Sequence, residues 1–204
     1  MAKSSTARQK LLEAAFSVIR AKGYAAATVD ELCQAAGVTK GAFFHHFKTK
    51  DELAVAAADH WSEATGAFFA AAPYHKATDP LDRVLGYLEF RKTILQGEVK
   101  EFTCLVGTMV QEVYDSAPAI RAACEASIIG HAENLEVDIS AAMKARGMKP
   151  GWTAASLALH TQAVLQGAFI LAKAKGGPEI AAESIEHLKR YVELLFARPT
   201  RNGE

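Results

Sequence analysis

One stretch, TVDELCQAAGVTKGAFFHHFKTKD at residues 28–51, constrains the fold more than any other part of the chain. Thr28 can cap a helix, Glu31 completes an S/T-x-x-E capping box, and Gly37 stands where a C′ glycine would end that helix. Thr39 is a second N-cap candidate, followed by only about two helical turns. Two short helices around a glycine-containing turn predict a helix-turn-helix, whose second helix can enter the major groove of DNA.

A further helix is predicted before this motif. Apolar residues recur with helical period from Thr6 to Lys22, and Gly23 ends the segment. Residues 1–50 are therefore predicted to form a compact domain of three helices. Its core is predicted to consist of six apolar residues at helical spacing, Phe16, Ile19, Leu32, Val38, Phe43 and Phe47.

Residues 51–204 are predicted to form a larger domain built from helices alone. Proline and glycine mark the breaks between its segments. The segments expected to be helical are 50–72, 79–97, 102–115, 118–146, 153–175 and 178–197. The predicted fold is all-α with about nine helices, an N-terminal helix-turn-helix domain at 1–50 and a helical body at 51–204.

The net charge of zero hides an uneven distribution. Residues 1–50 hold eight Lys and Arg against three Asp and Glu, a net charge of +5, which leaves −5 for residues 51–204. A basic head on an acidic body favours a polyanionic partner for the head, although a solvated polar face explains charge alone equally well. The helix-turn-helix decides in favour of double-stranded DNA.

Other features bound the remaining functions. The N-terminus leads into no apolar signal core, and apolar runs stay below the ~18 residues that span a bilayer, so we expect a cytoplasmic protein with no membrane partner. Three cysteines, at 33, 104 and 124, match no zinc spacing or disulfide framework, so we expect no metal and no cofactor. The sequence has no glycine-rich phosphate loop, G-x-S-x-G or H-E-x-x-H, which argues against an enzyme.

The segment GAFFHHF at 41–47 has to present one face to the protein and the other to DNA. Phe43 and Phe47, one helical turn apart, are expected in the core, where aromatic rings are commonly buried. Lys40 could donate to guanine O6 and N7. The adjacent His45 and His46 are not expected to form a metal site, because neighbouring side chains lie about 100° apart on a helix and share one ion poorly. The residues expected to contact DNA bases or phosphates are Thr28, Thr39, Lys40, Gly41, Ala42, Phe44, His45, His46, Lys48 and Lys50.

Residues 28–53, TVDELCQAAGVTKGAFFHHFKTKDEL, resemble the DNA-binding signature of the TetR family of transcriptional repressors. The layout, a short helical head before a long helical body, is similar too. The resemblance implies a homodimer that binds a palindromic operator and releases it when a small-molecule inducer binds the body. Phe44 departs from the family pattern, which usually has Tyr there, so the ring is kept and the hydroxyl donor is lost.

The inducer that this resemblance implies would need a pocket in the body. Aromatic and methionine side chains suit an apolar or aromatic ligand, although for each residue by itself an ordinary helical core is the commoner explanation. The residues expected to line the pocket are Trp61, Phe68, Tyr87, Phe90, Phe102, Cys104, Met109, Met143 and His160. Gln111, Glu112, His131 and His160 could be its polar anchors, although each could equally be exposed or bonded within the core.

The last two predicted helices carry apolar stripes. Two such helices from each chain would make a four-helix bundle across a two-fold axis, although both stripes could instead pack into the core of a single chain. A dimer would place two recognition helices one DNA turn apart, about 34–36 Å. Given the resemblance, we expect a dimer interface formed by Leu157, Val164, Leu165, Ala168, Phe169, Ile185, Leu188, Tyr191, Val192 and Leu195.

Cys104 supplies an alternative means of control. It lies near a predicted helix start, a position that favours a reactive thiolate, and Arg91, Lys92 and Lys100 are close in sequence. A redox-sensing repressor that oxidises Cys104, alone or with Cys124, is therefore the alternative function. The competing explanation is a small buried apolar residue, which is what most free cysteines are.

Overall fold

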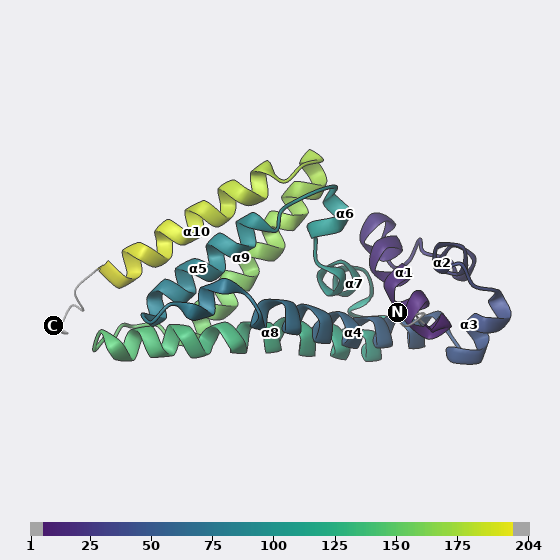
Figure 1. Cartoon of the computed structure of the whole chain (residues 1–204), viewed down its shortest axis with the longest axis horizontal. Coiled ribbons are helices and arrows are strands. Elements are labelled where there is room, and N and C mark those ends of the chain that lie inside the picture. The colour runs from purple at the N-terminus through teal and green to yellow at the C-terminus, as the bar shows by residue number, and fades with distance from the viewer. Residues whose placement is uncertain (1–5, 198–204) are drawn as a thin grey trace. The chain divides into compact units, whose positions relative to one another are not determined.

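The computed structural model describes residues 6–197, which form helices joined by short connections (Figure 1). Within those residues the elements are α1 (Ala7–Lys22), α2 (Val29–Ala36), α3 (Lys40–His46), α4 (Lys50–Ala70), the 3-10 helix η1 (Pro73–Lys76), α5 (Pro80–Thr93), α6 (Val99–Phe102), α7 (Leu105–Val113), α8 (Pro118–Ala145), α9 (Ala154–Lys175) and α10 (Glu179–Ala197). The predicted all-α fold is confirmed. The described part has ten α-helices because the segment predicted at 102–115 begins only at Leu105, and a separate short helix, α6, precedes it.

The helix boundaries in the motif follow from its capping residues. Thr28 Oγ1 accepts from the backbone NH of Glu31 at 3.2 Å, and the Glu31 carboxylate accepts from the NH of Thr28 at 3.0 Å, so the predicted capping box is present. Gly37 ends α2 with a φ of 62°, a left-handed conformation that glycine adopts without steric penalty. Thr39 then caps α3 by accepting from the NH of Ala42.

Packing within the chain defines two compact units. The first comprises the chain up to Gly66 together with Thr103–Ile128, and the second comprises Ala67–Phe102 and the chain from Ile129 onward. The division falls inside α4, whereas the sequence predicts a boundary after residue 50. The difference has a physical cause, since the first half of α4 contributes four buried apolar residues to the core of the first unit, Leu53, Ala54, Ala57 and Ala58.

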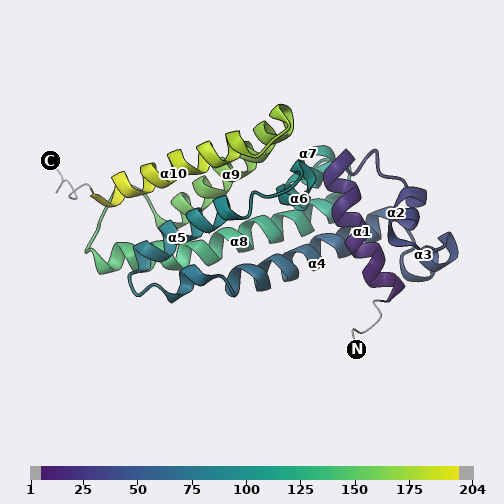
Figure 2. The same cartoon turned by 45° about the horizontal axis from the view of Figure 1, so that its top comes forward.

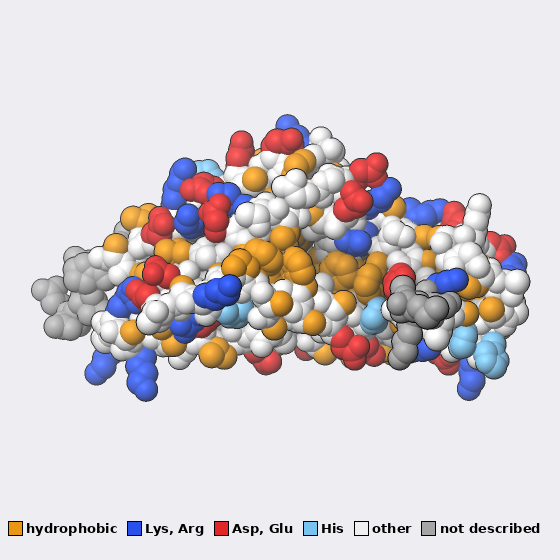
Figure 3. Space-filling view, viewed as in Figure 1, with side chains coloured by type: hydrophobic (Ala, Val, Ile, Leu, Met, Phe, Trp, Pro, Cys, Tyr) orange, Lys and Arg blue, Asp and Glu red, His pale blue; other side chains and the backbone are white. Residues whose placement is uncertain are grey.

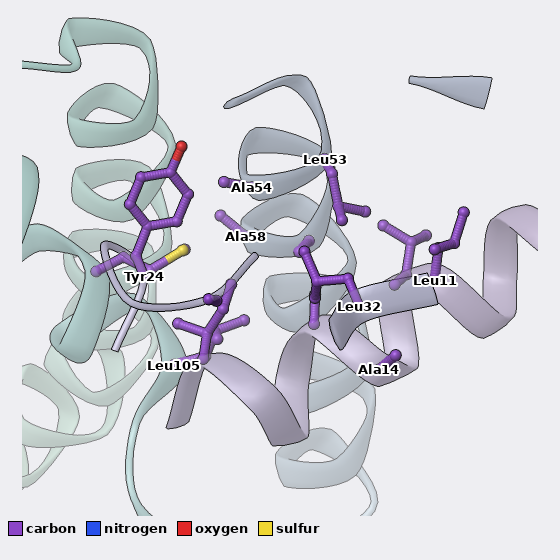
Figure 4. Packing of buried hydrophobic residues seen from close by; sticks show 14 of the residues in the cluster. Leu11, Ala14, Tyr24, Leu32, Leu53, Ala54, Ala58 and Leu105 are labelled. Atoms are coloured by element: carbon purple, nitrogen blue, oxygen red, sulfur yellow. The ribbon is translucent and has the colours of Figure 1, made fainter. Parts of the chain in front are cut away.

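The core of the first unit draws on α1, α2, α3, α4, α7 and α8. Figure 4 shows Leu11 of α1, Leu32 of α2 and Leu53 of α4 gathered in one cluster, with Leu105 of α7 beside it. The predicted core residues all belong to this cluster, four of them buried (Ile19, Leu32, Phe43 and Phe47) and two half-buried against it (Phe16 and Val38).

In the second unit, α5 packs against η1 and α10, and α9 packs along α10 (Figures 1 and 2). One described helix, α9, has the length and composition needed to cross a bilayer. Eight of its residues are buried in the folded chain, among them Leu165 and Phe169 and the polar Thr161 and Gln162. Packing within this unit therefore explains part of the apolar character of α9.

Candidate nucleic-acid interface and ligand site

Two aromatic side chains anchor α3 through its inner face. Phe43 is fully buried and Phe47 nearly so, and their ring centroids lie 6.0 Å apart. The ring of Phe44 packs edge-on against that of Phe43, with 5.1 Å between centroids, yet 54% of Phe44 is exposed. The short helix therefore fixes one face in the core of the first unit and presents the other to solvent.

The outer face of α3 carries most of the residues predicted to contact DNA. Figure 3 shows histidine and basic side chains at the surface over this helix. Two of the predicted contact residues, Ala42 and Lys50, are half-buried, and the others are exposed: Thr28, Thr39, Lys40, Gly41, Phe44, His45, His46 and Lys48. Within the described residues, no group of three His, Cys, Asp or Glu side chains is placed to hold a metal ion.

The two lysines with different predicted roles are also held differently. Lys40 Nζ lies 2.6 Å from the Asp30 carboxylate, and both side chains are largely exposed, so water and salt weaken this pair. Lys50 Nζ donates to the backbone carbonyls of Tyr24 and Ala27, each at 3.0 Å, and lies 4.2 Å from the centre of the Tyr24 ring. Lys40 can thus exchange its partner for a base or phosphate at little cost, whereas Lys50 holds the loop between α1 and α2.

A carboxylate of α7 holds the same loop. Glu112 accepts from the backbone NH of Tyr24 at 3.1 Å and from that of Ala25 at 2.7 Å. The Tyr24 hydroxyl donates to Asp51 in the first turn of α4, and burial and this bond raise the pKa of Tyr24. We call Lys50, Asp51 and Glu112 the loop clamp, because together they bond the backbone and side chain of the segment that leads into α2.

The position of Glu112 favours the alternative of a side chain bonded within the protein over that of a ligand-pocket anchor. Its carboxylate oxygens are bonded to the α1–α2 loop instead. Glu112 approaches the backbone closely at Gly23, whose φ is 89°. A Cβ at this position would clash with a Glu112 carboxylate oxygen. A glycine at a helix end is visible in the sequence, but no local pattern says which distant side chain comes up against it.

The residues predicted to line one pocket are divided between the units. Trp61, Cys104 and Met109 belong to the first unit, whereas Phe68, Tyr87, Phe90, Phe102, Met143 and His160 belong to the second. Met109 is fully buried in the first core, and Trp61 packs edge-on against Phe16. His160 is exposed on α9, next to the ring of Tyr191.

Three of the predicted pocket residues do come together, around a residue that sequence reasoning missed. Phe68, Tyr87 and Phe90 surround Phe69, with ring centroids 5.5, 5.8 and 5.6 Å from its own. The His131 ring lies 4.8 Å from the same centre. These rings form one aromatic group in the second unit with His131 as a polar member, and its use as a ligand pocket stays a prediction.

Most residues predicted for a dimer interface are instead buried within one chain. The buried ones are Leu157, Leu165, Ala168, Phe169, Ile185, Leu188 and Val192, so for them the alternative of a single-chain core holds. The large apolar side chains that α9 and α10 leave exposed are Leu159, Ile170, Leu171, Tyr191 and Leu194. We call these five the exposed apolar residues of α9 and α10. Both helices are apolar on more than one side, so helical period alone does not say which side faces the chain's own core.

A short second helix, buried on one side and polar on the other after a glycine turn, defines a helix-turn-helix DNA-binding protein. Residues 11–57 match the family described as bacterial regulatory proteins, tetR family. Residues 80–180 match the C-terminal domain described as transcriptional regulator LmrA/YxaF-like. The chain belongs to the TetR family of transcriptional regulators.

Known proteins resemble the chain in sequence and in fold. The transcriptional regulator AcuR of Cereibacter sphaeroides is 28% identical over 110 residues, covering 54% of this chain but only 50% of that protein. The crystal structure of regulatory protein TetR from Rhodobacter sphaeroides has a TM-score of 0.81 at 23% identity, covering 92% of this chain and 99% of that one. A cysteine mutant of the TetR family regulator CifR, in a structure with 26bp double-strand operator DNA, has a TM-score of 0.75 at 19% identity, covering 90% and 95%.

Proposed function

We propose that the protein is a homodimeric repressor that binds a palindromic operator through α3 and releases it when a small molecule binds the helical body. The observation that carries this proposal is α3 itself, whose inner face is anchored by Phe43 while Lys40, Phe44 and His46 stay exposed. Lysine and histidine donors suit guanine edges and phosphates, and an exposed ring can touch a thymine methyl. The operator-bound structure of CifR supports the same use of this fold. Such a regulator works in the cytoplasm and catalyses no reaction.

Support for the homodimer comes from the exposed apolar residues of α9 and α10. Each of these five side chains is between 45% and 59% exposed. Tyr191 of α10 lies beside His160 of α9, with ring centroids 5.4 Å apart, so exposed surfaces of the two helices adjoin. Contact with a second copy of the chain would remove this apolar surface from water. A two-fold axis through that contact would relate the α3 helices of the two chains.

Coupling between ligand and DNA is proposed to pass through the loop clamp. α4 supplies Lys50 and Asp51 and α7 supplies Glu112, and all three bond the loop that precedes α2. A ligand that favours a shifted α4 would displace this loop and the helices that follow it. Ligand affinity and DNA affinity would then oppose each other by the same factor.

Selection of bound duplexes from a random DNA library tests the proposal, with the purified protein at about 150 mM salt because DNA affinity depends on salt. A palindromic consensus is expected, with half-sites about 10 bp apart. A consensus without two-fold symmetry contradicts the dimer. Enrichment of no sequence, even at low salt, contradicts unaided operator reading.

The oligomeric state is tested separately by sedimentation equilibrium. Leu194→Glu and Ile170→Glu place a charge among the exposed apolar residues of α9 and α10 and should produce monomers. Val137→Glu, at an exposed apolar position on α8, is the matched control and should stay dimeric. Wild-type behaviour of both test variants contradicts an interface at this surface.

A thiol-based redox sensor is the second candidate, favoured by the position of Cys104. Its Sγ caps α7 by accepting from the NH of Gly107 at 3.4 Å, so oxidation would disturb the start of the helix that carries Glu112. The thiol of Cys124 rarely ionises to the reactive thiolate, because burial raises its pKa to about 12. Peroxide should then weaken DNA binding by the wild-type protein and not by Cys104→Ser. Equal losses in both proteins remove this candidate.

A further inference from the structure

Arg91 of α5 is a half-buried cation that is surrounded by neutral groups. Its Nε donates to Tyr87 Oη at 2.9 Å, its Nη2 donates to His131 Nε2 at 2.8 Å, and its guanidinium carbon lies 4.3 Å from the centre of the Phe69 ring. Across residues 6–197, no Asp or Glu forms an ion pair with it. A positive charge withdrawn from water without a counter-charge is unfavourable, so this arrangement requires an explanation.

Two acids of the same unit are paired with other cations. Asp138 lies 2.6 Å from Arg83, and Glu89, two residues before Arg91 on α5, lies 3.2 Å from Lys92. Their negative charges are therefore balanced locally. The charge of Arg91 remains uncompensated by the described part of the chain.

Donor and acceptor roles determine the protonation of this cluster. A guanidinium only donates, so His131 Nε2 accepts from Arg91 and carries no proton. Tyr87 Oη accepts from Arg91 and from Gln162 Nε2 at 3.4 Å, and its own hydrogen is directed to His131 Nε2 at 2.9 Å. Burial, with the charge of Arg91, lowers the pKa of His131 to about 3, so the imidazole stays neutral and adds no second positive charge beside Arg91.

These hydrogen bonds occupy one edge of the guanidinium. The Nε and Nη2 atoms serve Tyr87 and His131, whereas Nη1 has no hydrogen-bond partner in the part of the chain that the structure describes. A guanidinium has more N–H groups than these bonds use, and its Nη1–Nη2 edge can donate to both oxygens of a carboxylate in parallel. The site thus keeps a bidentate donor for an anion.

Aromatic rings accompany the cation. Phe69 packs against the guanidinium, and the Phe90 centroid lies 5.6 Å from that of Phe69. Phe68 is half exposed and lies 5.3 Å from Phe90. Rings in this arrangement can bury the apolar surface of a small molecule whose polar end is held elsewhere.

We propose that Arg91 anchors a small organic anion, a carboxylate attached to an apolar or aromatic body. The carboxylate binds the Nη1–Nη2 edge, Tyr87 and His131 fix the orientation of the guanidinium, and the body lies against the Phe68–Phe90 rings. The proposal rests on the regulatory function above, since this anion is the inducer. It adds a negative charge to the apolar or aromatic ligand expected from the sequence.

Binding to the wild-type protein in the absence of DNA tests this ligand class. The probes are benzoate, phenylacetate and cinnamate, each compared with its neutral primary amide by calorimetry and by thermal shift. At least one carboxylate should bind roughly tenfold or more tightly than its amide, as expected for a charge-assisted hydrogen-bonded pair. Equal binding of acid and amide, or no binding of any carboxylate up to its solubility limit, overturns the proposal.

Variants at Arg91 test whether this residue is the source of the preference for carboxylate over amide. Arg91→Gln should abolish the preference for acid over amide, and Arg190→Gln, at an exposed arginine of α10, should leave it unchanged. Arg91→Lys keeps the charge but loses the planar fork, and should bind the carboxylate roughly tenfold more weakly than wild type. A folded Arg91→Gln that still prefers the acid overturns the proposal. If circular dichroism shows Arg91→Gln unfolded, an unweakened Arg91→Lys overturns it.

Failure of this proposal can be told apart from failure of the regulatory function. A protein that selects a palindromic operator yet shows no acid preference keeps its regulatory function and loses the anion site. A protein that binds a carboxylate through Arg91 yet selects no DNA keeps the anion site and loses the operator.

Discussion

Two groups of charged side chains, one in each unit, are bonded in different ways. In the first unit, the charges that approach the α1–α2 loop are bonded to backbone groups, Lys50 to carbonyls and Glu112 to NH groups. In the second unit, Arg91 lies among neutral side chains, and its hydrogen bonds within residues 6–197 go to Tyr87 and His131. The first arrangement holds a loop in one conformation, whereas the second leaves guanidinium N–H groups for the anion that we propose.

This contrast relates to the two tasks of a regulator. A helix that contacts DNA has to be held in a reproducible orientation, so the charged side chains that hold it are best bonded to groups of the protein itself. A sensing site has to gain free energy when a ligand arrives, so some of its donors are best left for that ligand. Variants on the two sides of this contrast are expected to differ widely in their effect on stability.

The largest loss of stability is expected when α3 loses its anchor. Phe43→Ala removes a fully buried ring and should destabilise the first unit by about 3–5 kcal/mol, with loss of operator binding. Urea denaturation followed by circular dichroism measures the change. Phe44→Ala, the matched control on the exposed face, should alter stability by less than about 0.5 kcal/mol and weaken operator binding instead. Similar stability losses in both variants would contradict the division of α3 into an inner and an outer face.

Acid should act on the second unit through His131. Burial and Arg91 lower the pKa of this residue to about 3 in the folded chain, against about 6.5 for an ordinary histidine. Between these values the unfolded chain binds a proton that the folded chain does not, so stability falls as the pH decreases. At pH 4 the free energy of unfolding should be about 2–3 kcal/mol lower than at pH 7.

Urea titrations over this pH range measure the effect. His131→Gln, which keeps an acceptor for Arg91, should flatten the profile between pH 4 and 6.5. Asp79 provides a separate window, since its bond with Arg146 lowers its pKa to about 2 and its stabilisation is lost only as the pH falls from about 3.8. A profile unchanged by His131→Gln would show that another group is responsible.

Removal of the carboxylate from the loop clamp is expected to have an intermediate effect. Glu112→Ala leaves the NH groups of Tyr24 and Ala25 without their partner and should destabilise the first unit by about 1 kcal/mol. Operator affinity should fall roughly tenfold, because the loop before α2 is no longer held. Glu125→Ala, at an exposed acid of α8, is the control for loss of charge. Full operator affinity in Glu112→Ala would rule out a positioning role.

The smallest change in stability is expected for Lys40→Ala. Its ion pair with Asp30 is exposed, so the loss should stay below about 0.5 kcal/mol. The preference for operator over random DNA should nevertheless fall roughly tenfold, as for loss of a base contact. Lys50→Ala removes a support of the α1–α2 loop and should instead weaken binding to operator and random DNA by a similar factor. If Lys40→Ala weakens operator and random binding equally in competition assays, Lys40 does not read a base.

The helix-turn-helix could be predicted in detail because its determinants are local. Thr28 and Glu31 are three residues apart, as are Thr39 and Ala42, so a short sequence window contains both partners of each cap. Gly37 likewise adopts its left-handed conformation within the same window. The inner and outer faces of α3 follow from helical period once Phe43 and Phe47 are assigned to the core.

Contacts between distant residues could not be predicted in this way. Glu112 is 88 residues from Tyr24, and His131 is 44 residues from Tyr87, so no local pattern records either contact. The importance of Arg91 depends on which acids are paired elsewhere, which only the folded chain reveals. Seven of the ten residues predicted for the dimer interface are buried within the chain for a related reason, since a stripe such as that around Leu165 is equally apolar whether it faces its own chain or a partner.

The exposed apolar residues of α9 and α10 also bear on how much of the protein a cell has to make. If a second copy covers them, the amount of dimer at low concentration rises with the square of the amount of chain. Repression would then set in over a narrow range of expression, and a scarce regulator would leave its target transcribed even without an inducer. Gene dosage would thus be a second input to the switch, beside the ligand.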